Sequence, residues 1–392
     1  MKIGIVLSQA PGYSETFFRS KMSGLLSMGH QVFLFAPNPS KVSINGVTIV
    51  EPYNKDENSS FTFFCNALAA IFVCLFVIPR RSFRFLRFEH EDQRSWRLAL
   101  ENLFINTHIL RYPLDWIHYG FATMALRREN VGRAILAKQA VSFRGFDISI
   151  YPLKHKGCYN LLWQRVDRVH TISNDLLHLA NEQGLHPHTE VFRIPPAIDV
   201  NAFYSDKRTG QLSAKIRILS VGRLHWKKGY EYALSAFSLL KEQGVDFEVA
   251  IVGDGDEYER LAFSIYQRGL SQQVVLAGRK SHAEVARMMS RYDIYIQPSV
   301  QEGFCNSVLE AQCSGLLCVV TNAEGLAENV LNGQTGFVVP VRDSEALKNA
   351  ILQIIAMGDL ERLQMIVKAQ SRVVQEFSVE NQKLQFHQFY IN

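Results

Sequence analysis

The feature that most constrains the fold is an alternation of short β-rich runs with helical stretches, which occurs twice along the 392-residue chain. A helical stretch that ends at Gly29 separates the first two runs. Alternation of this kind predicts parallel strands joined by helices, and hence an α/β protein with two Rossmann-like, doubly wound sheets. The first series of runs comprises 2–8, 31–37, 47–52, 115–120, 137–144, 167–173 and 190–195, and the second comprises 216–222, 247–256, 274–278, 294–299, 317–321 and 336–340.

The stretch between the two series has a different composition. It reads PPAIDVNAFYSDKRTGQLSA, with paired prolines and little apolar periodicity, which is typical of a linker. We therefore predict a first domain at 1–196, a second domain at 197–372, and a helix at 373–392 that packs back toward the first domain. Because open α/β sheets bind ligands at the carboxyl ends of their strands, a large ligand is expected in a cleft where the two domains face each other.

Composition excludes several classes of partner. The formal net charge of +5 is mild and no Lys/Arg tract occurs, so no nucleic-acid partner is expected. The six cysteines form no CxxC pair, which is typical of free thiols in a reducing compartment. The N-terminal stretch MKIGIVLSQAPGYSETF lacks the pattern of a signal peptide and is interpreted as a first strand. We expect a cytoplasmic protein.

One apolar segment leaves three interpretations open. Residues 61–79 are almost wholly apolar, close to the shortest length that spans a membrane, and Arg80, Arg81, Arg84 and Arg87 follow them. The segment fits a buried crossover helix of the first domain. It also fits a peripheral element on the cytoplasmic face of the membrane, with the arginines on anionic headgroups. A true span is disfavoured because the strands on both sides belong to one predicted sheet.

Two cations follow the first strand of the second series. The loop SVGRLHWKKGY carries Arg223 and Lys228 and leads into a helix. The N-terminus of a helix contributes partial positive charge and free N–H groups. Together these groups predict a site for a di-anion, although a solvated basic loop has the same composition.

A second strand-to-helix turn, QPSVQEGFCNSVLEA, also has the features of a phosphate site. Gly303 allows a ligand to approach the backbone closely. Asn306 and Ser307 are expected to cap the helix that begins there, and its first N–H groups favour phosphate oxygens.

Two carboxylates bracket this turn. Glu302 lies at the carboxyl edge of the strand, and Glu310 falls in the first or second turn of the helix. We expect them to contact one ligand at different points, Glu302 in the cleft and Glu310 at a sugar hydroxyl, as acidic residues do in dinucleotide folds. The alternative is that Glu310 is a capping carboxylate on a surface helix.

These stretches carry a resemblance to a known family. SVGRLHWKKGY, AIVGDGDEYERL and the segment 298–340 resemble the second domain of GT-B glycosyltransferases, in particular the retaining, nucleotide-sugar-dependent enzymes of family four. The family pattern of a Glu, seven residues and a Glu, preceded by G-R-x-x-x-x-K-G, is present. In the first domain, 9–35 resembles the family's Pro-x-x-Ser-Glu-Thr-Phe opening. The resemblance is weak over 53–112.

The resemblance implies a role for each of these residues. Arg223 and Lys228 would hold the donor diphosphate, Glu310 would bind the ribose, and Glu302 would contact the transferred sugar. The turn at Gly12 would approach the donor phosphates from the first domain. The donor-binding set would be completed by Gly303, Phe304, Asn306 and Ser307.

On the acceptor side the chain departs from the family. Many members carry His-x-His where this chain has His118 and Gly120, and His-Gly-x-Asp where it has Arg144 and a later Asp147. A guanidinium cannot act as a base, but it can hold an acceptor phosphate or carboxylate. His118, Arg144 and Asp147 are therefore the acceptor-side candidates, with His118 counted among the catalytic ones. The alternative for His118 is a core histidine.

The resemblance implies a hexosyltransferase that retains anomeric configuration. It would move a sugar from a nucleotide diphosphate donor to a hydroxyl of a glycan or lipid-linked acceptor, in cell-surface polysaccharide synthesis. No cofactor is expected. The triplet at 254–256 has the form Asp-x-Asp, but the cations already placed for the diphosphate make a metal unnecessary. The alternatives are a non-catalytic donor-binding subunit and a sugar-nucleotide epimerase or phosphorylase on the same fold.

Overall fold

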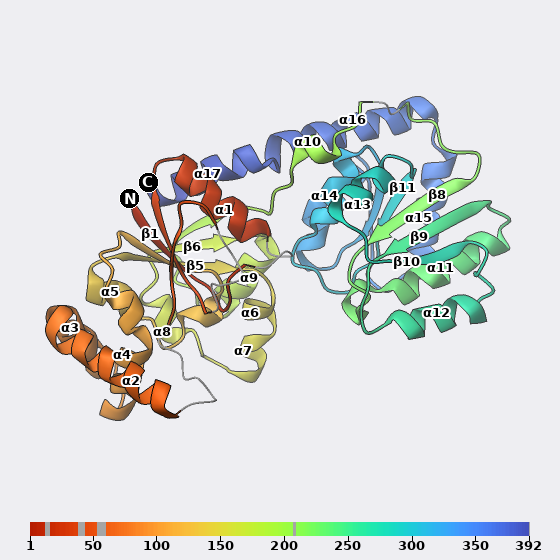
Figure 1. Ribbon diagram of the computed structural model, residues 1–392. Coiled ribbons are helices and arrows are strands. Elements are labelled where there is room, and N and C mark those ends of the chain that lie inside the picture. Colours follow the sequence, from red (N-terminus) through yellow and green to blue (C-terminus); the bar gives the residue numbers. More distant parts are fainter. Residues whose placement is uncertain (12–15, 38–43, 53–59, 207–208, 392) are drawn as a thin grey trace. The chain divides into compact units, whose positions relative to one another are not determined.

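The computed structural model of the chain describes residues 1–11, 16–37, 44–52, 60–206 and 209–391 (Figure 1). It contains two compact units. Unit 1 comprises Met1–Ile194 together with Lys383–Asn392, and unit 2 comprises Pro195–Gln382. The first boundary lies beside the predicted linker, whereas the second lies inside the segment predicted as a single C-terminal helix.

Unit 1 is built on a seven-stranded parallel sheet of order β3-β2-β1-β4-β5-β6-β7. Every β-rich run predicted in the first half forms one of its strands. Their side chains are apolar on both faces, as expected where helices cover both sides of a parallel sheet. Ile3, Ile5 and Leu34, for example, are fully buried. The strands are β1 (Lys2–Val6), β2 (Gln31–Phe35), β3 (Thr48–Val50), β4 (Trp116–Tyr119), β5 (Lys138–Phe143), β6 (Arg168–Thr171) and β7 (Glu190–Arg193).

The helices of unit 1 connect these strands in the right order for a doubly wound fold. α1 (Thr16–Ser27) follows β1 and contributes Met22 and Leu25 to the core. The shorter helical elements lie between β4 and β7. They are η3 (Ala122–Ala125), α5 (Val131–Ile135), α6 (Phe146–Ser149), α7 (Tyr151–Lys154), α8 (Asn160–Trp163) and α9 (Asn174–Glu182).

The long connection between β3 and β4 forms a helical layer of its own. It contains α2 (Ser60–Phe72), the π-helical turn η2 (Val73–Val77), α3 (Pro79–Glu91) and α4 (Trp96–Leu110). Large apolar side chains of this layer are exposed, including Phe72 at 58%, Phe76 at 71% and Phe83 at 71%. The interpretation as a buried crossover helix is therefore wrong for the described part of 61–79.

No single described helix is long and apolar enough to cross a membrane. The pair Cys65–Val77 and Pro79–Glu91 reaches the required length and composition only together, and it is bent by 104°. The bend falls where Pro79 begins α3, because proline cannot continue the preceding helical hydrogen bonds.

Unit 2 contains a six-stranded parallel sheet of order β10-β9-β8-β11-β12-β13. One face of this sheet forms a hydrophobic core in which Ile218, Ile251 and Val319 cluster with Phe237 of a covering helix. The strands are β8 (Ile216–Val221), β9 (Phe247–Val252), β10 (Val274–Gly278), β11 (Ile294–Gln297), β12 (Leu317–Thr321) and β13 (Phe337–Val339). The helices are α10 (Val200–Phe203), η4 (Trp226–Lys228), α11 (Tyr230–Glu242), α12 (Tyr258–Gln267), α13 (His282–Met289), α14 (Asn306–Cys313), η5 (Glu324–Asn329), α15 (Ser344–Ala356) and α16 (Asp359–Glu376).

The C-terminal segment is divided between two helices. α16 ends at Glu376 and α17 (Val379–Ile391) begins after a short break, so the helix predicted at 373–392 starts later than predicted, and its first residues belong to α16. The end of α17 packs on the sheet of unit 1, where the indole N–H of Trp116 donates to the carbonyl of Tyr390 at 3.1 Å.

Candidate functional site

The two predicted phosphate-binding turns lie side by side at one edge of the unit 2 sheet. β8 and β11 are paired neighbours, and a loop follows each strand at its carboxyl end. The backbone N–H of Val300 donates to the carbonyl of Lys227 at 2.7 Å, which joins the two loops directly. The carboxyl edge is where open parallel sheets bind ligands.

Gly229 allows these loops to approach each other. Its φ of +64° lies in the left-handed region, which side chains disfavour. A Cβ atom added there would lie 2.1 Å from the carbonyl oxygen of Pro298. This contact explains why glycine ends the short helix that carries Lys228.

The Gly-rich turn at 253–256 supports the loop after β8. The N–H of Leu224 donates to the carbonyl of Asp254 at 2.9 Å. A Cβ on Gly253 would lie 1.9 Å from the carbonyl oxygen of Gly222, so the turn requires glycine. The Asp254 carboxylate is exposed and accepts from Gly255 N–H at 2.8 Å. No group of three His, Cys, Asp or Glu side chains suited to a metal ion occurs among the described residues.

Lys228 and Glu302 form an ion pair at this edge, with the Lys228 ammonium donating to the Glu302 carboxylate. Each side chain is only 18% exposed. Burial opposes the charge of Lys228, yet its pKa is raised because Cys305 and Glu302 lie beside it. Burial also raises the pKa of the neighbouring Cys305 thiol. Lys228 is thus a fixed cation.

Arg223 has a different environment. Its side chain is exposed and makes no ion pair or hydrogen bond with any of the residues that the structure describes. A guanidinium at the carboxyl edge of the sheet is therefore available to an anion. Lys228 and Arg223 together provide the two cations that the sequence predicted.

The start of α14 differs from the sequence prediction. Neither Asn306 nor Ser307 caps the helix, because Cys305 is the N-cap residue and its side chain makes no capping hydrogen bond. The Ser307 hydroxyl instead lies 3.2 Å from the carbonyl of Val221 and 2.8 Å from the hydroxyl of Tyr295. Ser307 therefore fastens α14 to the end of β8.

Asn329 holds the same loop from the other side. Its side-chain amide accepts from Cys305 N–H at 3.2 Å and donates to the Cys305 carbonyl at 2.9 Å. The neighbouring Phe304 is buried and packs against Phe377, with ring centroids 5.7 Å apart. These contacts fix the backbone at Gly303, which is partly exposed.

Glu310 has a partner that the sequence did not reveal. Its carboxylate lies 3.1 Å from Nε2 of His282 at the start of α13. The hydrogen bond to Glu310 is the main reason that the pKa of His282 is raised. Glu310 is only 12% exposed in its side chain, whereas His282 is 55% exposed. A sugar hydroxyl would therefore meet a carboxylate that is already oriented.

The structure places His118 in the core of unit 1. The side chain is fully buried, and its ring lies 2.6 Å from the Tyr390 hydroxyl, 2.7 Å from the Ser142 hydroxyl and 3.2 Å from the Lys21 ammonium nitrogen. Burial strongly lowers the pKa of His118. An acceptor cannot reach this ring unless α17 moves away, so we do not carry His118 into the proposed mechanism.

Asp147 and Arg144 organise one loop of unit 1. The buried Asp147 carboxylate accepts from the N–H groups of Arg144, Gly145 and Ala122 at 3.1, 3.0 and 2.9 Å. Burial nevertheless raises the pKa of Asp147. The Arg144 guanidinium stacks on Phe17 at 3.8 Å from the ring centroid. The geometry gives Asp147 a structural role in place of the acceptor contact that the sequence predicted.

The two remaining predictions for unit 1 concern glycines. Gly120 occupies the second position of the family's His-x-His motif, and a Cβ there would lie 2.3 Å from Leu7 Cδ2. A second histidine at this position would require the Leu7 side chain to move. Gly12 lies outside the described residues, and its role as a donor contact stays a prediction.

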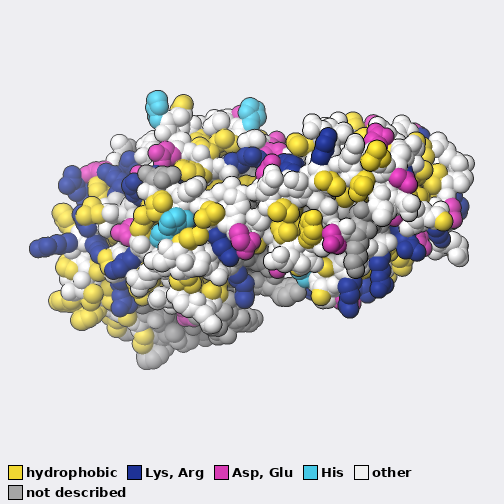
Figure 2. Space-filling view, turned by 90° about the horizontal axis from the view of Figure 1, so that it is seen from above, with side chains coloured by type: hydrophobic (Ala, Val, Ile, Leu, Met, Phe, Trp, Pro, Cys, Tyr) yellow, Lys and Arg dark blue, Asp and Glu magenta, His cyan; other side chains and the backbone are white. Residues whose placement is uncertain are grey.

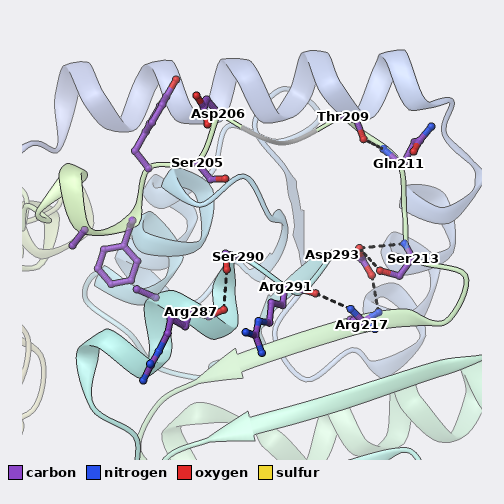
Figure 3. Close-up of a pocket in the computed structure, with 14 residues that line it drawn as sticks. Ser205, Asp206, Thr209, Gln211, Ser213, Arg217, Arg287, Ser290, Arg291 and Asp293 are labelled. Carbon is purple, nitrogen blue, oxygen red and sulfur yellow. Dashed lines mark hydrogen bonds between the residues drawn. The ribbon is translucent and has the colours of Figure 1, made fainter.

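A cavity of unit 2 with a volume of about 710 Å³ lies at the opposite edge of the sheet (Figure 3). Arg217 near the start of β8 and Asp293 just before β11 line it. Asp293 accepts from Ser213 and from the backbone N–H of Arg217, which ties the linker to the sheet (Figure 3). None of the predicted donor residues lines this cavity.

Comparison with known proteins shows a family match for the segment that forms most of unit 2. Residues 205–372 match the family described as glycosyl transferases group 1. This segment is a group 1 glycosyltransferase domain. It contains both turns, the Lys228–Glu302 pair, Arg223 and Glu310.

The whole chain is similar to curated glycosyltransferases. It is 26% identical to the amylovoran biosynthesis glycosyltransferase AmsK of Erwinia amylovora, with 99% of this chain and 98% of AmsK covered. It is also 26% identical to the putative colanic acid biosynthesis glycosyltransferase WcaL of Escherichia coli K12, with 96% of each covered. The chain is a glycosyltransferase.

The fold of the glycosyltransferase is also found among solved structures. Anabaena Alr3699/HepE in complex with UDP aligns with a TM-score of 0.73 at 16% identity, covering 99% of this chain and 98% of that one. The GT-B fold expected from the resemblance is confirmed, with its two Rossmann-like sheets.

Three residues of the glycosyltransferase site were missed by sequence reasoning: His282, Asn329 and Tyr295. Each reaches the site from an element outside the two motifs. A capping box at Ser281 and Glu284 marked where α13 begins, but it gave no sign that His282 contacts Glu310.

Proposed function

We propose that this glycosyltransferase moves a sugar from a nucleotide diphosphate donor to a hydroxyl of its acceptor, with retention of anomeric configuration and without a metal ion. The observation that carries the proposal is the pair Lys228–Glu302 beside the available cation Arg223, at the carboxyl edge of the unit 2 sheet. Retention rests on the resemblance to family four.

The chemistry that these residues support is stabilisation of the leaving group. Negative charge develops on the donor diphosphate as its bond to the sugar breaks. Lys228 and Arg223 would offset this charge, each by about 2–4 kcal/mol if they are preorganised. Because Lys228 is a fixed cation, it needs no proton transfer before the reaction.

The two glutamates would orient the two sugars of the donor. Glu302, paired with Lys228, would accept hydroxyl hydrogen bonds from the transferred sugar, and Glu310, aligned by His282, would do so from the ribose. Interactions at both ends hold the bond that breaks close to the cations, which favours reaction through positioning.

The names of the relatives support a role in cell-surface polysaccharide synthesis, since AmsK is named for amylovoran and WcaL for colanic acid. We propose a cytoplasmic location with peripheral contact to anionic membrane, supported by the exposed apolar and arginine side chains of the α2–α4 layer. Figure 2 shows yellow and dark blue side chains intermixed at the left end of the molecule, over these helices.

The proposal is tested by incubating the purified protein with common nucleotide sugars and following donor hydrolysis. We expect one donor to be turned over and its activity to persist in EDTA, because Arg and Lys supply the charge that a metal would otherwise provide. NMR of the early product should show the donor's anomeric configuration. Loss of turnover in EDTA that manganese or magnesium restores would contradict metal independence.

A further inference from the structure

Helix α4 of unit 1 lines two different cavities with two adjacent faces. Leu100, Leu103 and Thr107 line one cavity, at the i, i+3 and i+7 spacing of a single helix face. Glu101, Ile105 and His108 line the other, at the i, i+4 and i+7 spacing of the neighbouring face. Phe104 lines both cavities, so its ring lies between them.

The first cavity is an apolar groove of about 540 Å³ on the α2–α4 layer. Ile71, Leu75 and Phe83 line it and are 53%, 61% and 71% exposed, so the groove opens to the surface. None of the described residues that line it carries a charge. A soluble protein rarely leaves so many large apolar side chains exposed together without a ligand or partner.

The second cavity has a volume of about 660 Å³ and lies at the carboxyl ends of β1 and β2, where Leu7 and Ala36 line it. It contains a cation that has no carboxylate partner: no described Asp or Glu oxygen lies within 4.0 Å of the Arg128 guanidinium nitrogens. Arg128 donates only to the carbonyl of Met124, at 3.1 Å, and its Nε is buried without a partner.

His108 adds a second unsatisfied group to this cavity. Its side chain is 5% exposed, and its Nδ1 is buried without a hydrogen-bond partner. Burial, and then the charge of Arg128, lower its pKa to about 3, so the ring is neutral at physiological pH. The cavity is thus lined by a guanidinium and a neutral imidazole whose hydrogen-bonding capacity is not fully used by the described residues.

We propose that unit 1 binds an amphiphilic acceptor, with an anionic phosphate or diphosphate group at Arg128 and His108 and its hydrocarbon chain in the apolar groove. The inference rests on the proposed function, in that unit 1 then holds the acceptor of the transfer. Arginine suits phosphate because its N–H groups match phosphate oxygens. The acceptor class is a lipid-linked sugar, in which a phosphate joins the sugar to a long hydrocarbon chain.

The shared ring of Phe104 fits the junction of such a molecule. An anionic head in the polar cavity places the first carbons of its chain beside Phe104, and the next carbons enter the groove toward Leu103 and Leu75. Each CH₂ group removed from water there would strengthen binding by about fourfold. A purely peripheral contact with a bilayer would not use the buried polar atoms of the second cavity.

Farnesyl diphosphate is a suitable probe because it carries the chain and the anion but no nucleotide. We expect calorimetry on the full chain to give a dissociation constant at least about tenfold tighter than that of inorganic diphosphate or of farnesol. Since the probe cannot be transferred, its binding is measured independently of donor hydrolysis. Absence of donor turnover would therefore remove the proposed function and leave this result intact.

A matched pair of variants tests whether the hydrocarbon chain of the probe lies in the groove. Leu75→Glu places a charge in the groove and should weaken the probe by at least about tenfold. Phe76→Glu is the control, since Phe76 is 71% exposed on the same turn but does not line the groove. Equal loss in both variants would mean that the groove does not hold the hydrocarbon chain of the probe, and would overturn the proposal.

A second pair of variants tests whether the diphosphate of the probe binds at Arg128. Arg128→Gln should weaken farnesyl diphosphate by about tenfold or more and leave farnesol unchanged, whereas Arg97→Gln, at a side chain that is 92% exposed, should change neither. Circular dichroism of each variant checks the fold, and native mass spectrometry of the wild type gives a second measure of binding. No binding of farnesyl diphosphate to the wild type, or binding no tighter than that of diphosphate, would overturn the proposal.

Discussion

At the residue scale, the donor site depends on two cations with unequal surroundings. We expect Lys228→Ala and Arg223→Ala each to lower turnover by about two orders of magnitude, because each removes charge that stabilises the leaving diphosphate. Their effects on stability should differ. Arg223 has no partner among the described residues, so its loss should not change the melting temperature. Loss of Lys228 leaves the partly buried Glu302 unpaired and should destabilise the protein by about 1–3 kcal/mol.

Lys227→Ala is the matched control, because Lys227 lies in the same short helix but does not pair with Glu302. Its turnover should stay within about twofold of wild type. Wild-type turnover in both the Lys228 and Arg223 variants would remove the proposed donor site.

The His282–Glu310 contact predicts a pH dependence of stability. The pKa of His282 is raised in the folded protein, above its unfolded value of about 6.5. Its contribution is therefore fully present below about pH 6.5 and is lost as the pH rises through the folded pKa. We expect His282→Gln to lower the melting temperature more at about pH 5.5 than at about pH 8.5.

Asp199 also favours the charged form of His282, so a second variant is needed to separate its effect from that of Glu310. In a Glu310→Gln background, the pH dependence of the His282→Gln effect should be smaller. An effect of the same size at both pH values in the wild-type background would contradict the charged contact.

At the scale of elements, the loops after β8 and β11 act as one unit because Gly229 lets them touch. Gly229→Ala would bring a Cβ within 2.1 Å of the Pro298 carbonyl oxygen and force a left-handed conformation on alanine. We expect a loss of turnover of about tenfold or more, since Lys228 and Glu302 are displaced together. Gly244→Ala is the control: its φ is +74°, but a Cβ there has no neighbour within 4 Å.

Turnover and melting temperature together should distinguish displacement of Lys228 and Glu302 from a general loss of stability. If Gly229→Ala and Gly244→Ala lower the melting temperature equally but only Gly229→Ala lowers turnover, the contact with Pro298 positions the site. Equal turnover in the two variants would mean that backbone strain alone matters.

At the same scale, the sequence predicted elements better than their contacts. Each predicted strand exists because runs such as 216–222 and 294–299 are rich in apolar and β-branched residues, as strands covered on both faces require. Arg223, Lys228, Glu302 and Glu310 share one edge because their motifs follow parallel strands. The partners Asn329 and His282 could not be predicted, because they arrive from elements whose packing no local pattern encodes.

At the scale of the whole molecule, two expectations depended on burial, which the sequence does not determine. A buried apolar helix and an exposed one have the same composition, so 61–79 was compatible with the core. His118 shows the converse, since a histidine near a family motif proved to be part of a buried network around Lys21. Burial is a property of the assembled fold, and a periodicity of apolar residues does not determine it.

The exposed layer leads to a prediction about membranes that depends on which arginines are exposed. Arg80 and Arg87 are exposed on α3, whereas Arg81 donates to the Leu110 carbonyl at 2.8 Å and is committed to the fold. Each exposed arginine near an anionic surface contributes about 1 kcal/mol, and Phe76 and Phe83 supply apolar rings at headgroup depth. We expect the protein to co-sediment with anionic vesicles and to be released by high salt.

Variants separate this surface binding from folding and from the groove. Arg80→Ser with Arg87→Ser should weaken vesicle binding by about thirtyfold without a change in melting temperature, because the two side chains contribute about 2 kcal/mol together. Arg81→Ser should lower the melting temperature instead. Phe76→Glu should weaken vesicle binding while leaving farnesyl diphosphate bound, since a bilayer contacts the whole exposed face but a single chain contacts only the groove. Equal binding to neutral and anionic vesicles would show that the arginines contribute nothing and that the apolar rings alone hold the protein to the membrane.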